Sequence, residues 1–203
     1  SAIKRLELVF EDLDLTPAFS VTHCILGEAK LQSNRYEGTA AVAHFNATLN
    51  GPLDENFRAR ALWGLGRSYR SLGDAAKSSE YYFKAIEAPA GDLLRARILY
   101  DDAYMKIRSK RWLEASEGFK SVISIGDAGK PDLLMEQARL MQIKSTLGSI
   151  NLIEAISLLQ QIRNNPGLIL DEAILLVAQA HAMAENLDDA DEFLVELTRN
   201  DPA

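Results

Sequence analysis

Hydrophobic and polar residues recur along this chain with the spacing of paired α-helices, most clearly between Ala59 and Pro89. Early in this stretch, four residues fall at i, i+3, i+4 and i+7, the spacing that places side chains on one helical face. They are Leu62, Leu65, Gly66 and Tyr69. Because glycine costs about 1 kcal/mol relative to alanine inside a helix, Gly66 predicts that another helix packs closely against this face.

A turn and a second helix complete this unit. Gly73 favours a helix stop, and Asp74 favours an N-cap for the helix that follows. The second helix is expected to begin at about Ala75, and Pro89 ends it. Its buried face is formed by Ser78, Tyr82 and Ala85, at i, i+4 and i+7. The pattern therefore predicts two antiparallel helices that pack small residues against one large ring.

The second-helix pattern returns three times with the same four-then-three step. The copies are Ala115-Phe119-Val122, Ala155-Leu159-Ile162 and Ala190-Leu194-Leu197. They follow Ser78 at steps of 37, 40 and 35 residues, which is the range of stacked helical repeats. The intervening first helices are predicted at about 93–108, 132–147 and 171–185.

The region before Ala59 contains a weaker copy of the unit. Its two helices are predicted from Thr16 to Gln32 and from Arg35 to Leu49. Residues 2–15 form a further amphipathic segment, which is similar to the second half of such a unit. We therefore expect the sequence to be a piece of a longer chain.

Several of these residues resemble the tetratricopeptide repeat (TPR), a helix pair that stacks into a right-handed superhelix. The resemblance is carried by Leu65-Gly66, Tyr69, Leu72-Gly73, Tyr82, Ala85 and Pro89. Leu62 and Ser78 depart from the family, which usually has an aromatic residue and an alanine there. The resemblance implies an all-α, right-handed α-solenoid that forms a single domain over residues 1–203. Its five repeats would span about 17–50, 54–89, 92–125, 131–165 and 170–202, after a leading helix.

Composition and charge exclude several classes of protein. The chain has 203 residues, 47% hydrophobic and 25% charged, as in ordinary globular domains. Its longest apolar run, 173–184, is too short to insert into a membrane and contains Gln179 and His181. A net charge of −7 disfavours sequence-independent nucleic-acid binding, which depends on neutralising phosphates. Cys24 is the single cysteine, so no internal disulfide or multi-cysteine metal site exists. The composition fits the cytoplasm and the bacterial periplasm equally.

Motifs for catalysis or cofactor binding are missing or incomplete. Residues 126–131 differ from a phosphate loop because Ser124 replaces the first glycine and Pro131 replaces the Ser or Thr. His181 and Glu185 have the i, i+4 spacing of two metal ligands on a helix, and we interpret them as an ordinary helix-edge pair. We therefore predict no catalytic, cofactor or metal residue, and a protein that is not an enzyme.

The TPR resemblance also implies a ligand surface, because the first helices of this family line an inner groove. The side opposite their packing face carries Arg60, Trp63, Arg67, Arg70, Arg97, Tyr100, Tyr104, Arg108 and Lys144, with Leu140, Leu147 and Gln179 among the later positions. Arginine forks and aromatic faces suit an acidic peptide or a carboxylate. The alternative is that these arginines are solvated or paired with local acids such as Asp101, Asp102 or Glu55, and that Trp63 packs between repeats.

Three function classes are compatible with the sequence. The preferred class is an interaction scaffold that binds a protein or peptide segment in the groove. The second is a self-assembling structural module, a homo-oligomer or one whose groove is filled by its own flanking segments. The third is a non-catalytic solenoid attached to an enzyme domain outside this sequence.

Overall fold

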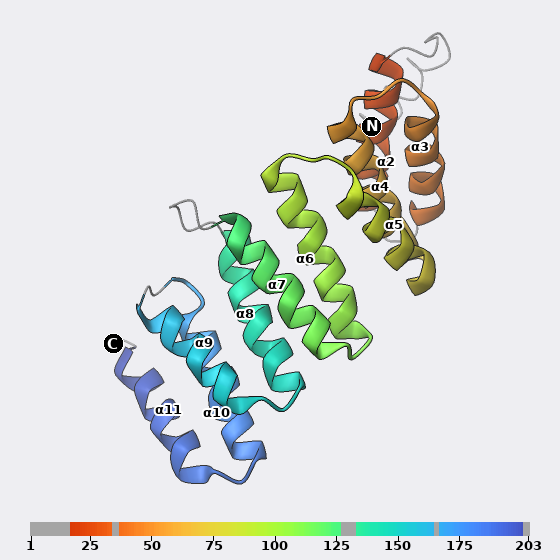
Figure 1. Ribbon diagram of the computed structural model, residues 1–203. Coiled ribbons are helices and arrows are strands. Elements are labelled where there is room, and N and C mark those ends of the chain that lie inside the picture. Colours follow the sequence, from red (N-terminus) through yellow and green to blue (C-terminus); the bar gives the residue numbers. More distant parts are fainter. Residues whose placement is uncertain (1–16, 34–36, 127–132, 165–166, 201–203) are drawn as a thin grey trace. The chain divides into compact units, whose positions relative to one another are not determined.

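The computed structural model describes residues 17–33, 37–126, 133–164 and 167–200. Within these ranges the chain forms ten α-helices and contains no strand (Figure 1). The helices are α2 (Pro17–Ser33), α3 (Gly38–Asn50), α4 (Glu55–Ser71), α5 (Ala75–Glu87), α6 (Asp92–Arg108), α7 (Trp112–Gly126), α8 (Leu133–Gly148), α9 (Leu152–Asn164), α10 (Leu170–Met183) and α11 (Leu187–Asn200). None of them is long and apolar enough to cross a membrane.

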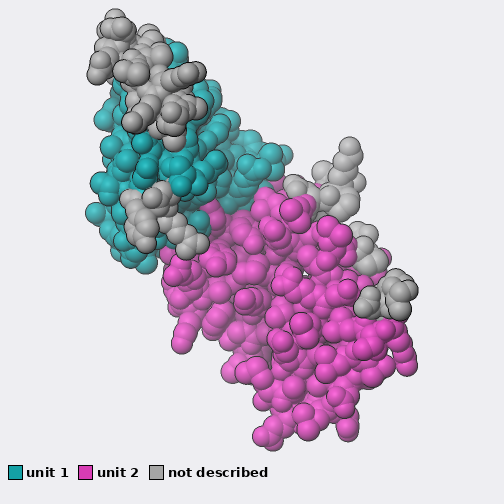
Figure 2. Space-filling view, turned by 180° about the vertical axis from the view of Figure 1, so that it is seen from behind, with its two compact units in different colours: residues 1–98 teal, residues 99–203 magenta. Residues whose placement is uncertain are grey.

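The chain divides into two compact units, residues 1–98 and 99–203 (Figure 2). In the first unit, α2 packs against α3 and α4 packs against α5. In the second unit, α7 packs against α8, α9 against α8 and α10, and α10 against α11. The helices of each of these pairs are consecutive in sequence, as in helical repeat proteins. The single domain expected over the whole chain stays a prediction.

The helix pair formed by α4 and α5 has the predicted small-against-large seam. Ser78, Tyr82 and Ala85 are buried, and the hydroxyl of Ser78 donates a hydrogen bond of 2.9 Å to the carbonyl oxygen of Gly66. A β-carbon placed on Gly66 would lie 2.6 Å from Cδ1 of Tyr82. The close approach that Gly66 predicted is confirmed.

The residues of the repeated pattern on the second helices are all buried in two of the three later copies. Those copies are Ala115-Phe119-Val122 on α7 and Ala155-Leu159-Ile162 on α9. On α11, Ala190 is buried but Leu194 is exposed. Among the described residues, no helix follows α11.

The turn between the two helices of a unit has the same geometry four times. Gly73, Lys110, Ile150 and Glu185 all have a positive φ, between 58° and 80°. In each turn, the backbone N–H of this residue donates a hydrogen bond to the carbonyl oxygen three residues earlier. The N–H of the next residue donates to the carbonyl oxygen five residues before it. This pair of backbone hydrogen bonds is the Schellman motif. Lys110, Ile150 and Glu185 follow Gly73 at steps of 37, 40 and 35 residues, the same steps as the buried faces.

The predicted helix ends agree with the structure to within a few residues, with identifiable differences. Asp92, expected as a cap, is the first residue of α6. The helix predicted to end at Glu185 ends at Met183, because Glu185 adopts the left-handed turn conformation. Asp74 caps α5 as predicted, since its carboxylate accepts a 3.0 Å hydrogen bond from the N–H of Lys77. The predicted helix at 2–15 and most of the 126–131 segment lie outside the described residues.

Candidate functional site

In residues 1–98, three of the predicted cations lie on α4, and one of them is already engaged. The guanidinium of Arg60 donates two hydrogen bonds of 2.5 Å to the carboxylate of Glu28 on α2. These bonds raise the pKa of Arg60 above its usual value. Arg60 was predicted to face a ligand, but it joins two helices of its own chain. Its partner is Glu28 rather than the local acids considered from the sequence.

Trp63 and Arg67 form a second contact on α4. The guanidinium carbon of Arg67 lies 4.9 Å from the centre of the Trp63 ring, a cation–π distance. Trp63 itself is half-buried and packs against the core formed by Ala59, Ala85 and Ile98. Arg70 is half-buried as well. The Trp63–Arg67 pair therefore lies at the surface, and the packing of the indole against the core restricts its movement.

Arg97, near the start of α6, differs from the arginines on α4. It is exposed and makes no ion pair with any residue in the described ranges. Among the cations predicted on this surface in residues 1–98, Arg97 is the one best available to a carboxylate from outside.

In residues 99–203, the predicted aromatic positions on α6 separate into one packed and one exposed ring. Tyr100 meets the edge of Phe119, with ring centres 5.3 Å apart. Burial is the main cause that raises the pKa of Tyr100, followed by the negative charges of Asp101 and Tyr104. Tyr104 is 38% exposed, and Arg108, four residues later, is exposed without an ion pair to a described residue. Tyr104 and Arg108 thus present a ring and a cation on the same helical face.

A cavity of about 550 Å³ lies between the neighbouring first helices α8 and α10. Its walls are mostly apolar, and Lys144 is the one charged residue among them. The principal lining residues are Trp112, Lys144, Leu147, Ile150, Leu176 and Met183. Lys144, Leu147 and Gln179, all on the predicted ligand face, line this cavity, whereas Leu140 is buried in the core.

Trp112, Ile150 and Met183 were not among the residues predicted from the sequence. The signal for Ile150 was present, because aligning the units by their repeat steps places it at the turn position of Gly73. A β-branched residue at a position that favours glycine is unusual. Trp112 and Met183 are 71 positions apart in the chain, so no local pattern relates them.

The described residues contain no group of three or more His, Cys, Asp or Glu side chains arranged to hold a metal ion. His181 does not pair with Glu185, because its Nδ1 lies 3.3 Å from the carboxylate of Asp189 on the next helix. The Cys24 thiol is buried, and burial is the main cause that raises its pKa to about 12. A thiol with this pKa stays protonated at neutral pH and is a poor nucleophile.

No protein-family model matches the sequence, and no curated protein matches it. Solved structures match it as folds. Nearly identical TPR-like repeats assigned to a kinesin light chain of Podosopora anserina share 14% identity and a TM-score of 0.69, covering 91% of this chain and 95% of that one. MamA from Desulfovibrio magneticus RS-1 shares 13% identity and a TM-score of 0.68, covering 92% and 96%. YrrB, a TPR protein with an unusual peptide-binding site, shares 16% identity and a TM-score of 0.68, covering 96% and 91%.

These similarities extend over nearly the whole chain at low sequence identity. The chain therefore has the fold of TPR proteins, and the all-α helical-repeat architecture predicted from the sequence is confirmed.

Proposed function

We propose that this chain, which has the TPR fold, is a non-catalytic scaffold that binds an extended segment of a partner protein along its first helices. The observation that carries the proposal is the set of cations on these helices. Arg97, Arg108 and Lys144 are exposed and make no ion pair with any described residue, in a chain whose net charge is −7. Such cations are available to carboxylates of a partner, which favours an acidic segment.

Two further points support a peptide as the partner. Helical repeat proteins present extended surfaces along which partner segments bind. YrrB, whose fold is similar to that of this chain, is a TPR protein with an unusual peptide-binding site. Exposed aromatic and cationic residues in one row, such as Tyr104 and Arg108, suit an extended chain that carries carboxylates.

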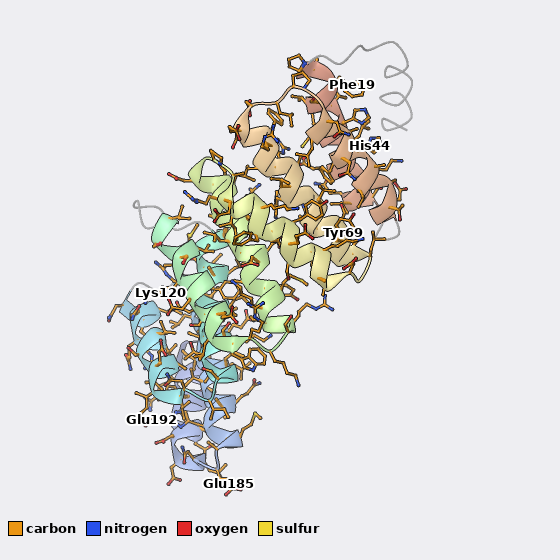
Figure 3. All side chains as sticks on the ribbon, turned by 45° about the vertical axis from the view of Figure 1, so that its right-hand side comes forward. Phe19, His44, Tyr69, Lys120, Glu185 and Glu192 are labelled. Atoms are coloured by element: carbon orange, nitrogen blue, oxygen red, sulfur yellow. The ribbon has the colours of Figure 1, made fainter. Side chains whose placement is uncertain are left out.

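The test is selection from a library of random twelve-residue peptides, followed by affinity measurement on the enriched sequences. We expect acidic sequences to be enriched, and the double variant Arg97→Glu, Arg108→Glu to bind them at least about tenfold more weakly, because attraction is replaced by like-charge repulsion. The matched control is Lys120→Glu, which reverses an exposed cation on the second helix α7 (Figure 3). Equal affinities for the double variant and the parent chain would refute the proposal.

Self-assembly is the second candidate, and the exposed face of α11 favours it. Leu194 and Val195 are both exposed on this helix, and a second copy of the chain could cover these apolar side chains. Light scattering over a hundredfold concentration range distinguishes the two candidates. A mass that rises with concentration supports self-assembly, and a constant monomer mass contradicts it.

A further inference from the structure

The cavity between α8 and α10 has an apolar rim at Ile150, a turn residue whose side chain is almost fully exposed. Ile150 has a φ of 61° and is 92% exposed. A left-handed conformation costs an L-residue free energy because its β-carbon approaches the following carbonyl oxygen. Burial does not compensate this cost, since almost all of the side chain is in contact with water. The left-handed conformation belongs to the Schellman turn that Ile150 shares with Gly73, Lys110 and Glu185. What distinguishes Ile150 is its large apolar side chain, which lines the cavity.

Met183 continues the apolar rim on the opposite wall. It is 88% exposed at the end of α10, and both Met183 and Ile150 line the cavity. Two large apolar side chains exposed around one opening are typical of a binding surface. Methionine is flexible and polarisable, so it adapts to side chains of different shape.

Trp112 forms part of the cavity wall and contacts the end of α8. A β-carbon on Gly148 would lie 2.5 Å from Cδ2 of the indole, so the indole packs directly on the backbone at the end of α8. Trp112 is half-buried by this contact and forms part of the cavity wall. The cavity therefore has a fixed aromatic wall and a deformable aliphatic rim, and its volume lies in the usual range of binding pockets.

The charged residues of the cavity wall determine which charge is favoured in a bound ligand. None of the described residues that line the cavity carries a carboxylate. Lys144 lies in its wall and is exposed, with no ion pair to a residue in the described part of the chain. An occupant that leaves Lys144 solvated or pairs it with a carboxylate is favoured over a cationic one.

We propose that this cavity binds a bulky apolar side chain of the partner peptide, and that an Asp or Glu next to it in the peptide pairs with Lys144. This inference rests on the proposed function, because it names the residues of the partner that anchor it. The apolar side chain supplies the buried area, and the carboxylate sets the direction in which the peptide crosses α8.

The test uses three capped hexapeptides: Gly-Ser-Phe-Glu-Ser-Gly, the same peptide with Ala in place of Phe, and the same peptide with Lys in place of Glu. Binding is followed by NMR of the chain labelled with ¹³C at its methionine methyl groups. We expect the Phe-Glu peptide to shift the Met183 signal saturably and to leave the signal of the buried Met105 unchanged. The other two peptides should bind at least about tenfold more weakly.

Three variants connect the signal to the cavity. Lys144→Glu should reverse the preference between the Glu and Lys peptides, and Ala180→Phe, which fills the cavity, should abolish the shift. Ile153→Ser is the matched control, because Ile153 is 83% exposed on α9 but does not line the cavity. It should leave peptide affinity unchanged.

Each other outcome contradicts the proposal in a way that can be recognised. If the peptide library yields acidic binders but the Phe-Glu peptide does not move Met183, the anchor cavity is refuted while the proposed function stands. Laurate is titrated as a fourth probe. If laurate shifts the Met183 signal and the peptides do not, the occupant is a fatty acid and the peptide anchor is wrong. If neither the library nor the hexapeptides bind, both proposals fail.

Discussion

The ring of Tyr82 on α5 occupies the space that a side chain at Gly66 on α4 would need. A β-carbon at Gly66 would lie 2.6 Å from Cδ1 and 2.7 Å from Cε1 of this ring, and Tyr82 is fully buried. Because Gly66 has no side chain, the backbones of α4 and α5 can approach closely at this contact.

The first prediction follows from this contact. Gly66→Ala should lower the free energy of unfolding by about 1 to 2 kcal/mol, since overpacking a buried site outweighs the gain of about 1 kcal/mol in helix propensity. Urea unfolding followed by circular dichroism measures this change. Gly91→Ala is the control, because a β-carbon there meets nothing within 4 Å, and it should change stability by less than about 0.5 kcal/mol. Equal effects would show that Tyr82 moves aside without loss.

The strained turn at Ile150 leads to the second prediction. Ile150→Gly should raise the free energy of unfolding by about 1 kcal/mol, because glycine adopts a positive φ without the steric cost and little burial is lost. The same change should weaken binding of the Phe-Glu peptide if Ile150 is part of the cavity rim. A thermal melt and a peptide titration on the same preparation check both effects. Lower stability in the glycine variant would indicate that Ile150 packs against the fold in solution.

The repeated alanines of the second helices are the subject of the third prediction. Ala155 is fully buried in a core cluster with Ile143 and Leu159. Ala155→Leu should cost about 1 to 3 kcal/mol of stability, because the added atoms have no space between closely packed helices. Ala182→Leu on the exposed side of α10 is the matched control and should be close to neutral. A neutral result at Ala155 would mean that this helix is not tightly packed.

A histidine pair predicts the pH dependence of stability. Nδ1 of His23 on α2 lies 2.9 Å from Nδ1 of His44 on α3, and the rings of Phe19 and His23 meet at an angle of 68° with their centres 4.3 Å apart. Burial first, and the proximity of His44 second, lower the pKa of His23 below its ordinary value of 6.5. The unfolded chain therefore binds this proton more readily than the folded chain.

The expected sign follows directly. The free energy of unfolding should fall as the pH drops below about 6.5 towards the lower pKa of the folded state, and this contribution is fully present above 6.5. Urea midpoints measured between pH 7.5 and pH 5 check the trend, and His23→Gln should give a shallower slope over the same range. An identical slope in the variant would assign the pH dependence to other groups.

Much of the fold was accessible from the sequence because its determinants are local. The i, i+4, i+7 faces, the caps and the turn residues act over one or two helical turns, so the steps of 37, 40 and 35 residues predicted both the helix pairs and their buried faces. Where local signals compete, the prediction shifted by a few residues, as at Asp92 and Glu185. Propensity alone does not decide whether such a residue starts a helix or precedes it.

The ligand surface was less accessible, and Arg60 shows why. Its position on α4 was predicted, but its partner Glu28 lies 32 residues earlier on another helix. Whether a cation is engaged or available depends on such pairings, which leave no periodic trace in the sequence. Tyr100 is a similar case, since its contact with Phe119 depends on how two helices pack.

By itself, the sequence of this protein determined a set of antiparallel helix pairs, their turns and the small residues along their seams, because these features depend on neighbours within a few positions. The tertiary structure decided which first-helix cations are available and where the cavity of Trp112, Lys144 and Met183 lies. Those features require residues from separate helices to meet, and packing between helices sets their distances.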